Sequence, residues 1–361
     1  MALTALLALA AGCGTTAPAT TEPTSPPVAT ATPTGIPTAT AGSTATPSAN
    51  ASQWIAYDWF ANREHHKDVN LIHPDGSGVH AVAADIETDV DHGLVDWSPD
   101  GQTLVFGTGE WYDGSKIWTV AVGGGNATQV IGPSDDCRLG VNFPAYSMDG
   151  KKLLYVCDDG VAGDDAHITE SLMVRDLATG ASTKVVTFTL PDELLSVRWS
   201  PDGKSAVVEL NQWELDGTEV KNIGSEVAVV TLADGKVDRL TESDSWAGSP
   251  DWSWTNGLIT YGTYGLLDHD MRKPSAIYTV RPDGTDLKEI PTGAHDGTRR
   301  VAGPRWTPDG SQLIVSVATG HGGDTENVLI GFLGLDGTLT FIPADGGEMR
   351  SGAGGRLQPI P

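Results

Sequence analysis

The sequence predicts an all-β fold: a six-bladed β-propeller of four-stranded antiparallel blades, with the ring closed by the C-terminal segment. The first observation is the phrase Trp97-Ser-Pro-Asp-Gly101, which recurs about every fifty residues, the spacing of a solenoid or propeller repeat. The second is that short apolar runs, split by Gly, Asp and Pro, follow each copy. The third is that no long stretch has the 3.6-residue period of a helix. The other copies are Tyr146–Gly150, Trp199–Gly203, Trp252–Gly257 and Trp306–Gly310.

Each repeat predicts the four strands of one blade in turn. The aromatic residue ends the first strand, and Pro-Asp-Gly turns the chain, because Pro presets φ and Gly accepts a positive φ. An apolar second strand follows, as in Leu104-Val-Phe106, Leu153–Val156, Ala206–Val208, Leu258–Tyr261 and Leu313–Val315. The third strand comes after a polar loop, as in Ile117–Val120, Leu172–Val174, Val227–Val230, Ile277–Val280 and Val328–Ile330. A Gly-centred turn then leads into a short fourth strand.

The ring needs a strand from the far end of the chain. The first blade begins with Trp54–Tyr57, which occupies the position of a second strand, so this blade has no opening strand of its own. The last blade ends near Ile342, and a tail follows it. We expect Gly355–Ile360 to supply the opening strand, because an unclosed ring would expose strand edges.

These repeats resemble those of the TolB-type six-bladed propellers, also described as WD40-like Pro-Asp repeats. The resemblance covers residues 53–361 and implies the propeller fold. The amino-terminal domain that precedes the propeller in the Tol-system protein has no counterpart in residues 1–52. Because one propeller fold serves many unrelated functions, the resemblance alone does not assign an activity.

The amino-terminal residues predict the location. Leu3–Ala11 is a short apolar run that ends in Ala10-Ala-Gly-Cys13, which resembles a bacterial lipobox. Residues 1–12 are then a lipoprotein signal peptide, and Cys13 is lipidated and tethers an extracytoplasmic protein to the cell membrane. Two alternatives are a cleaved, secreted protein and a transmembrane anchor, for which the run is short.

Residues 13–52 predict a stalk between the lipid and the propeller. Gly14–Ser52 consists almost entirely of Thr, Ala, Pro, Ser and Gly, a composition that cannot bury a core. At about 3.1 Å per residue such a segment spans roughly 100 Å when fully extended.

The net charge limits the kinds of partner that the protein can bind, and the cysteine content predicts a covalent bond within it. The formal net charge of −25 argues against a nucleic-acid partner, because phosphate binding needs a basic surface. We expect a monomer. With Cys13 lipidated, Cys137 and Cys157 are the two remaining cysteines, and the predicted hairpin brings them to one end, so we expect a disulfide, with a catalytic or metal-binding thiol as the alternative.

The turn aspartates Asp100, Asp202 and Asp309 are expected to make local hydrogen bonds, with bound calcium as the alternative. The oxygen-rich stretch Asp158–Asp165 is a second place for a cation, although it does not have the alternating spacing of an EF-hand loop. No other cofactor is indicated. The repeated Trp97, Trp199 and Trp306 are interpreted as packing between blades.

The candidate binding surface is the face formed by the connectors between blades and the loops between second and third strands. Histidine and aromatic residues concentrate in these loops, whereas the opposite face carries the repetitive Pro-Asp-Gly turns. The residues chosen are His92, Trp111, His167, Trp213, Trp246, His269, Arg272, His295 and His321.

Two functions fit this sequence. The first is a membrane-tethered binding module that uses the looped face to recognise a protein, peptide or glycan of the cell envelope, with Trp and Arg as anchors. The second is a metal-dependent polysaccharide lyase or hydrolase with a His/Asp site at the channel mouth. The sequence contains no Gly-x-Ser-x-Gly, His-Glu-x-x-His or phosphate-loop motif, and we therefore favour the binding module.

Overall fold

The computed structural model describes the propeller in detail. Residues Thr46–Pro361 form one structural unit, which contains the propeller. The described residues are 52–60, 67–82, 86, 92–109, 114–160, 168–216, 219–263, 275–293, 299–319, 327–343 and 355–360.

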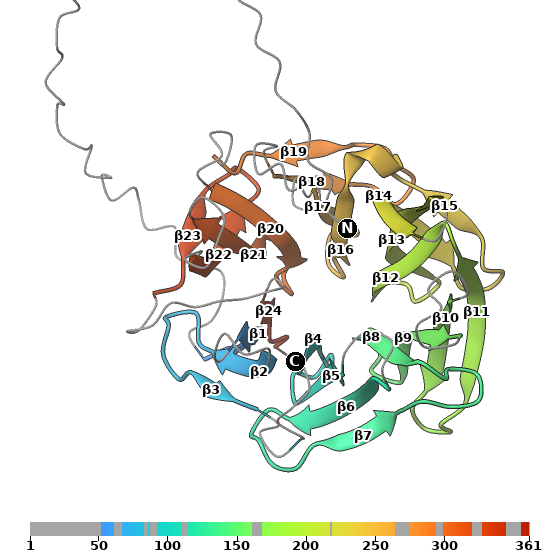
Figure 1. The fold of residues 1–361 in the computed structure, drawn as a ribbon. Coiled ribbons are helices and arrows are strands. Elements are labelled where there is room, and N and C mark those ends of the chain that lie inside the picture. The colour runs from blue at the N-terminus through green and yellow to red at the C-terminus, as the bar shows by residue number, and fades with distance from the viewer. Residues whose placement is uncertain are drawn as a thin grey trace, which may run out of the picture. The chain divides into compact units, whose positions relative to one another are not determined.

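Six antiparallel sheets of four strands each surround a common axis, which confirms the predicted fold (Figure 1). The first and second blades consist of β24 (Arg356–Leu357), β1 (Ile55–Phe60), β2 (Lys67–Ile72) and β3 (His80–Ala81), and of β4 (His92–Trp97), β5 (Thr103–Thr108), β6 (Lys116–Ala121) and β7 (Thr128–Ile131). The third and fourth consist of β8 (Gly140–Tyr146), β9 (Lys152–Asp159), β10 (Thr169–Asp176) and β11 (Ser182–Thr189), and of β12 (Asp192–Trp199), β13 (Ser205–Asp216), β14 (Glu219–Thr231) and β15 (Val237–Arg239). The fifth and sixth consist of β16 (Ala247–Trp252), β17 (Ile259–Thr263), β18 (Ala276–Val280) and β19 (Lys288–Ile290), and of β20 (Arg299–Trp306), β21 (Gln312–Thr319), β22 (Asn327–Gly334) and β23 (Leu339–Phe341). A single-turn 3₁₀ helix, η2 (Ser243–Ser245), precedes β16.

The C-terminal strand closes the ring as the sequence predicts. In β24, Arg356 pairs with Ala56 and Leu357 with Ile55 of β1. Gln358 extends this seam, because its backbone N–H donates to the Trp54 carbonyl at 2.7 Å and its side-chain Nε2 donates to the Gly101 carbonyl at 2.7 Å. Gly101 has a φ of +66°, and a Cβ there would lie 2.5 Å from the Pro359 carbonyl oxygen, so the tail fits against this turn only because the residue is glycine.

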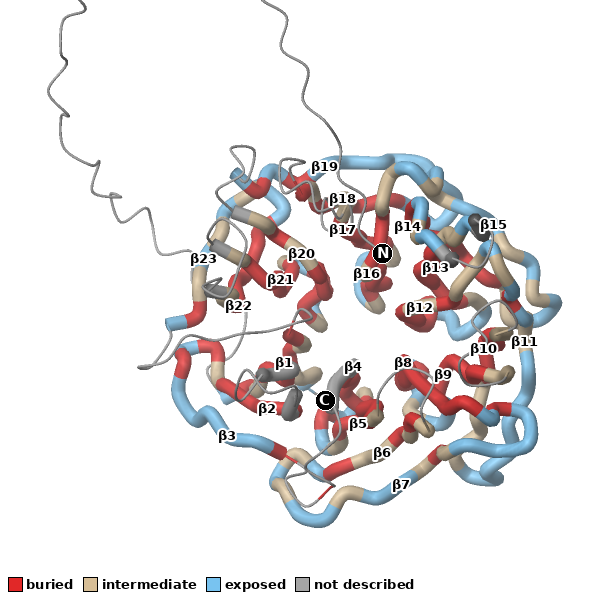
Figure 2. Tube along the Cα trace, in the orientation of Figure 1, coloured by how far each residue is buried: buried red, intermediate tan, exposed pale blue. Residues whose placement is uncertain are grey.

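The apolar core lies between neighbouring blades. Six clusters of buried residues are found in the described part of the chain, and each joins two adjacent sheets. Trp97, Trp199 and Trp306 each belong to one of these clusters and are 2%, 3% and 7% exposed, which confirms their interpretation as inter-blade packing. Leu357 occupies the corresponding place in the first blade. Figure 2 shows buried residues along the inner strands, while the outermost strands, among them β3 and β7, are largely exposed.

A β-bulge interrupts most of the innermost strands shortly before the repeated aromatic residue. The pairing register shifts in β4, β8, β12, β16 and β20. In four of these strands the third residue before the aromatic has a positive φ: 52° at Phe143, 34° at Ser196, 49° at Ser249 and 60° at Gly303. Bulges redirect side chains and are common beside functional sites. The residue directly before the aromatic follows the bulge, and alternation along the strand places its side chain on the other face of the strand from the aromatic ring.

Candidate functional site at the axial end of the Pro-Asp-Gly turns

The repeat motif builds the same hydrogen-bonded turn in several blades. In the second blade the Ser98 hydroxyl donates to Asp100 Oδ1 at 2.6 Å, the Gln102 N–H donates to the same oxygen at 3.0 Å, and the Thr103 N–H donates to the Ser98 hydroxyl at 2.9 Å. These bonds lower the pKa of Asp100, first through Ser98 and then through Gln102. The pattern recurs at Asp149, Asp202 and Asp309. The predicted local role of the turn aspartates is therefore confirmed.

The fifth copy of the motif departs from this pattern. Trp254 stands where three other copies have proline, and Asn256 precedes the turn glycine. This turn bonds to the next blade: Thr255 Oγ1 donates to the Pro308 carbonyl at 2.7 Å and Asn256 Nδ2 donates to the Gly310 carbonyl at 2.9 Å. The two turns are thereby held together, and Trp254 is left half-buried at the inner end of its blade.

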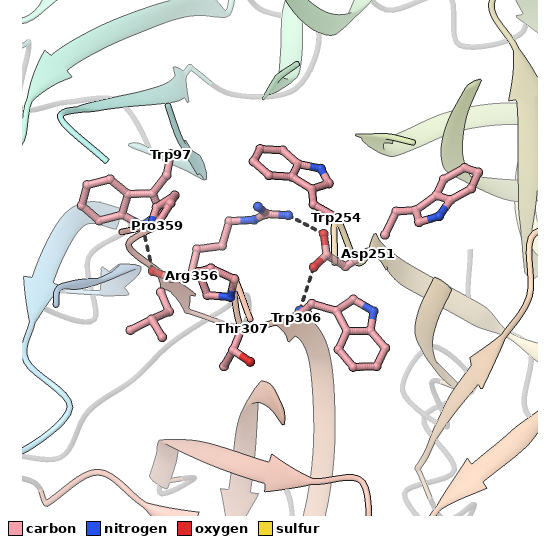
Figure 3. Close-up of a pocket in the computed structure, with 10 residues that line it drawn as sticks. Trp97, Asp251, Trp254, Trp306, Thr307, Arg356 and Pro359 are labelled. Carbon is pink, nitrogen blue, oxygen red and sulfur yellow. Dashed lines mark hydrogen bonds and ion pairs between the residues drawn. The ribbon is translucent and has the colours of Figure 1, made fainter. Parts of the chain in front are cut away.

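Trp254 forms part of a recess lined mainly by aromatic and proline side chains (Figure 3). Trp97, Trp252 and Trp306 supply the other indole rings, and Arg356 and Asp251 supply the charges; the remaining lining residues are Thr307, Pro308, Leu357 and Pro359. The recess opens at the end of the axis where the Pro-Asp-Gly turns lie, because Trp254 and Pro308 both belong to those turns. This is the face opposite to the one that the sequence analysis selected.

Charged residues converge beside this recess, and two of them, Asp251 and Arg356, line it. The position directly before the repeated aromatic holds Asp96, Ala145, Arg198, Asp251 and Arg305 in the second to sixth blades, and Arg356 in the first. Asp96 accepts a hydrogen bond from the Tyr146 N–H at 2.9 Å, and Asp251 accepts one from the Trp306 N–H at 2.8 Å. Each carboxylate thus ties its own blade to the next. We call these six residues the axial ring.

Arg356 links distant blades through the axial ring. Its Nη1 donates to Asp96 Oδ1 at 2.6 Å, and its Nη2 donates to Asp251 Oδ1. These partners lie in the second and fifth blades, so a single guanidinium joins the neighbouring blade to one across the axis. Burial lowers the pKa of Arg356, but the carboxylates of Asp251 and Asp96 outweigh this effect and raise it. The side chain is 16% exposed, and it is the cation that lines the recess.

Arg198 and Arg305 add two further cations. Arg305 Nη1 donates to the carbonyls of Ser249 at 2.9 Å and Pro250 at 3.2 Å. Arg198 Nε lies 3.6 Å from Asp251 Oδ1, beyond hydrogen-bond length. Burial and the guanidinium groups of Arg356 and Arg305 lower the pKa of Arg198 well below its ordinary value. Arginine stays protonated in proteins. The lowered pKa therefore reflects the unfavourable electrostatic energy of placing three guanidinium groups close together.

Two of the buried carboxyl groups outside the axial ring, on the second strands of the third and fourth blades, have pKa values raised to about 7. Burial raises the pKa of Asp158 to about 7, although Asn142 Nδ2 donates to its Oδ2 at 2.6 Å. Burial likewise raises the pKa of Glu209 to about 7, although its Oε2 accepts the Ser249 N–H at 2.7 Å. Among the described residues no group of three or more His, Cys, Asp or Glu side chains is placed to hold a metal ion.

The structure describes only part of the predicted binding face. Trp213 is half-buried and its Nε1 donates to Glu193 Oε2 at 2.7 Å. Trp246 is half-buried and follows η2 with a φ of 52°. His92 begins β4, and its side chain is not described. Cys13, Trp111, His167, His269, Arg272, His295 and His321 lie outside the described residues.

Cys137 and Cys157 form a disulfide, with a distance of 2.08 Å between the sulfur atoms. Cys137 lies before β8 and Cys157 lies within β9, so the bond joins the start of one strand to the far part of its antiparallel neighbour. Residues Asp158–Gly160 of the oxygen-rich stretch are described, and the rest lies outside the described part of the chain. No helix in that part is long and apolar enough to cross a membrane.

The sequence analysis missed the recess, although the sequence carries two signals for it. One is the irregular fifth copy, in which Trp254 replaces the proline of the motif. The other is the charge directly before the aromatic in four copies, repeated as Arg356 before Leu357 in the tail. The aromatic residues of the motif serve packing between blades, whereas the residue before each aromatic and the irregular fifth copy mark the site.

Comparisons with known proteins agree on the fold. No family model matches the chain. It is 23% identical over 186 residues to the uncharacterized peptidase YuxL of Bacillus subtilis, and this match spans 51% of the chain and 23% of YuxL. The structure superposes on TolB from Acinetobacter baumannii with a TM-score of 0.58 and 17% identity, covering 85% of this chain and 67% of that one. For a putative TolB from Agrobacterium tumefaciens the TM-score is 0.53 and the identity 17%, covering 81% and 89% of the two chains. The chain is thus a six-bladed β-propeller structurally similar to TolB.

Proposed function

We propose that this protein is a membrane-tethered extracytoplasmic binding module that recognises a protein, peptide or glycan of the cell envelope. The observation that carries the proposal is the recess in which Trp97, Trp252, Trp254 and Trp306 surround the charged pair Arg356 and Asp251. Ligand sites are typically lined by apolar and aromatic side chains with a few placed polar groups. Trp and Arg are also the residues that most often dominate binding energy at interfaces.

The recess is held rigidly, which favours binding without large ordering costs. Trp252 and Trp306 are each 7% exposed and packed between blades. Trp254 belongs to a turn that is hydrogen-bonded to the neighbouring turn at Pro308 and Gly310. A ligand therefore meets the half-buried Trp254 and the small exposed parts of Trp252 and Trp306, whose positions are already set by the blades.

Sequence features support the proposed location. The lipobox-like segment that ends at Cys13 and the Thr/Pro-rich stretch after it suit a propeller presented away from a membrane. The Cys137–Cys157 disulfide suits an oxidising compartment. The long-looped face, with Trp213 and Trp246, remains a second predicted recognition surface.

The test is a crosslinking capture from the native envelope. The full-length lipoprotein, a Trp254→Ala variant and a control in which the propeller is deleted after Ser52 are compared. We expect an envelope component that the full-length protein captures, that the variant captures less, and that the control does not. Capture of the same components by the propeller-deleted control would overturn the binding function, and undiminished capture by Trp254→Ala would move recognition away from the recess.

A further inference from the structure

The axial ring carries more positive than negative charge. Its charged members are Arg198, Arg305 and Arg356 against Asp96 and Asp251, three cations and two anions, which leaves one positive charge in excess. Glu209 interacts with Arg305, but burial raises its pKa to about 7, so it offsets that charge only in part near neutral pH. The axial ring is therefore locally positive, although the chain as a whole has a net charge of −25.

The same centre holds hydrogen-bond donors that have no acceptor among the described residues. Within that part of the chain, Arg356 Nε and Trp306 Nε1 are buried and without a hydrogen-bond partner, and both residues line the recess. Trp97 and Trp199 occupy the place of Trp306 in other blades, and their Nε1 atoms donate to the carbonyls of Arg356 at 2.9 Å and Ala145 at 3.0 Å. Arg198 Nε, in a side chain that is 9% exposed, also has no hydrogen-bond partner in the part of the chain that the structure describes. The unpaired donors and the excess positive charge both favour binding of an anion that accepts hydrogen bonds.

We infer that the recess binds a carboxylate group, and that the carboxylate is the free C-terminus of a peptide lying against Arg356. Arginine is well suited to carboxylates because it makes charge-assisted hydrogen bonds with them. Nη1 and Nη2 of Arg356 already donate to Asp96 and Asp251, and Nε is the donor that a ligand carboxylate would engage. This inference rests on the proposed binding function and adds the chemistry of the ligand.

The overall charge of the protein favours a peptide as the source of the carboxylate. An acidic polysaccharide repeats its carboxylates along the chain and would be repelled by a protein with a net charge of −25. A peptide brings one carboxylate at its end and can be neutral or basic elsewhere. The aromatic and apolar walls, Trp254, Leu357 and Pro359 among them, suit an apolar side chain on the terminal residue.

The experiment measures binding to the full-length protein through its tryptophan fluorescence at constant ionic strength. The probes are N-acetylphenylalanine and its amide, which differ in the terminal charge alone. We expect the acid to bind with a dissociation constant at least roughly tenfold lower than that of the amide, as suits a charge-assisted hydrogen bond. Equal affinities, or no binding of the acid up to solubility, would overturn the inference.

Variants locate the effect. Arg356→Gln should remove the preference for the acid, whereas Arg281→Gln, at a 58% exposed cation in a surface pair, should keep it. Because Arg356 also supports the fold, Trp254→Ala provides a second variant that should weaken the acid by a similar factor while circular dichroism stays unchanged. Retention of full affinity in both recess variants would place the carboxylate elsewhere and overturn the assignment.

A second pair of probes separates the sources of the carboxylate. Glucuronate and glucose differ in the carboxylate of a sugar, and we expect neither to compete with N-acetylphenylalanine. Competition by glucuronate with no binding of the amino-acid probe would overturn the peptide assignment. The proposed function would survive that outcome, since its own test is capture of an envelope component.

Discussion

Arg356 and Asp96 form a 2.6 Å salt bridge across 260 residues of chain, between the strand that closes the ring and the second blade. Asp96 is 1% exposed at its side chain, and Asp251, the other partner of Arg356, is 5% exposed. Such buried charges are tolerable only when they are paired. The residue that closes the ring therefore also pairs with both carboxylates of the axial ring.

Replacing Arg356 should destabilise the propeller strongly. Arg356→Gln removes the cation that pairs with Asp96 and Asp251. Breaking a buried ion pair by removing one partner costs about 3–5 kcal/mol of stability. The free energy of unfolding, measured in urea, should fall by that order. Arg281→Gln breaks the exposed 3.7 Å pair with Asp286 and should cost less than about 1 kcal/mol. A similar loss in both variants would contradict the role of the axial pair.

Trp254 and Trp306 should separate binding from folding. Trp306 is 7% exposed within an inter-blade cluster, and Trp306→Ala should cost about 3–5 kcal/mol of stability. Trp254 is half-buried in a turn, so Trp254→Ala should cost less and should still weaken ligand binding. Thermal unfolding and fluorescence titration of both variants measure the two effects. A stability loss at Trp254 as large as that at Trp306 would make Trp254 a packing residue.

The disulfide should contribute to stability. Cys137 and Cys157 are separated by 20 residues, and closing a loop of this length typically stabilises a protein by about 2–4 kcal/mol. We expect a double Cys→Ser variant to unfold at lower urea concentration than the oxidised protein. Dithiothreitol should lower the midpoint of the native protein and leave that of the variant unchanged. Sensitivity of the variant to the reductant would assign the effect to another cause.

Asp158 should make stability fall as the pH rises through neutrality. Burial raises its pKa from 3.8 to about 7, so between these values the folded state holds a proton that the unfolded state has released. Stability then decreases with rising pH across this window, by up to a few kcal/mol at about 1.4 kcal/mol per pKa unit.

Asp158→Asn should remove this dependence, because an amide oxygen can still accept from Asn142 Nδ2. We expect the variant to exceed the native protein in stability at pH 8 and to match it near pH 4, as measured by urea unfolding across the pH range. Asp100→Asn is the contrasting control, since hydrogen bonds to Ser98 and Gln102 lower the pKa of Asp100. A variant with the pH profile of the native protein would show that Asp158 is ionised in the fold at neutral pH.

The amino-acid sequence by itself determined the repeat, the six blades and the closing strand. These features are local or periodic: the bonds that Asp100 makes in its turn lie within five residues, and each repeated tryptophan marks the end of an inner strand. The pairing of Cys137 with Cys157 follows from one hairpin and was also accessible.

The tertiary structure decided which of these regular features forms a site. Asp96, Arg198, Asp251, Arg305 and Arg356 are separated along the chain and meet only because the ring brings the same position of every blade to one axis. Trp254 faces the recess because its irregular turn bonds to the sixth blade, a contact that no local pattern contains. Electrostatic pairing depends on distances across the closed ring, and a sequence read along one dimension does not carry those distances.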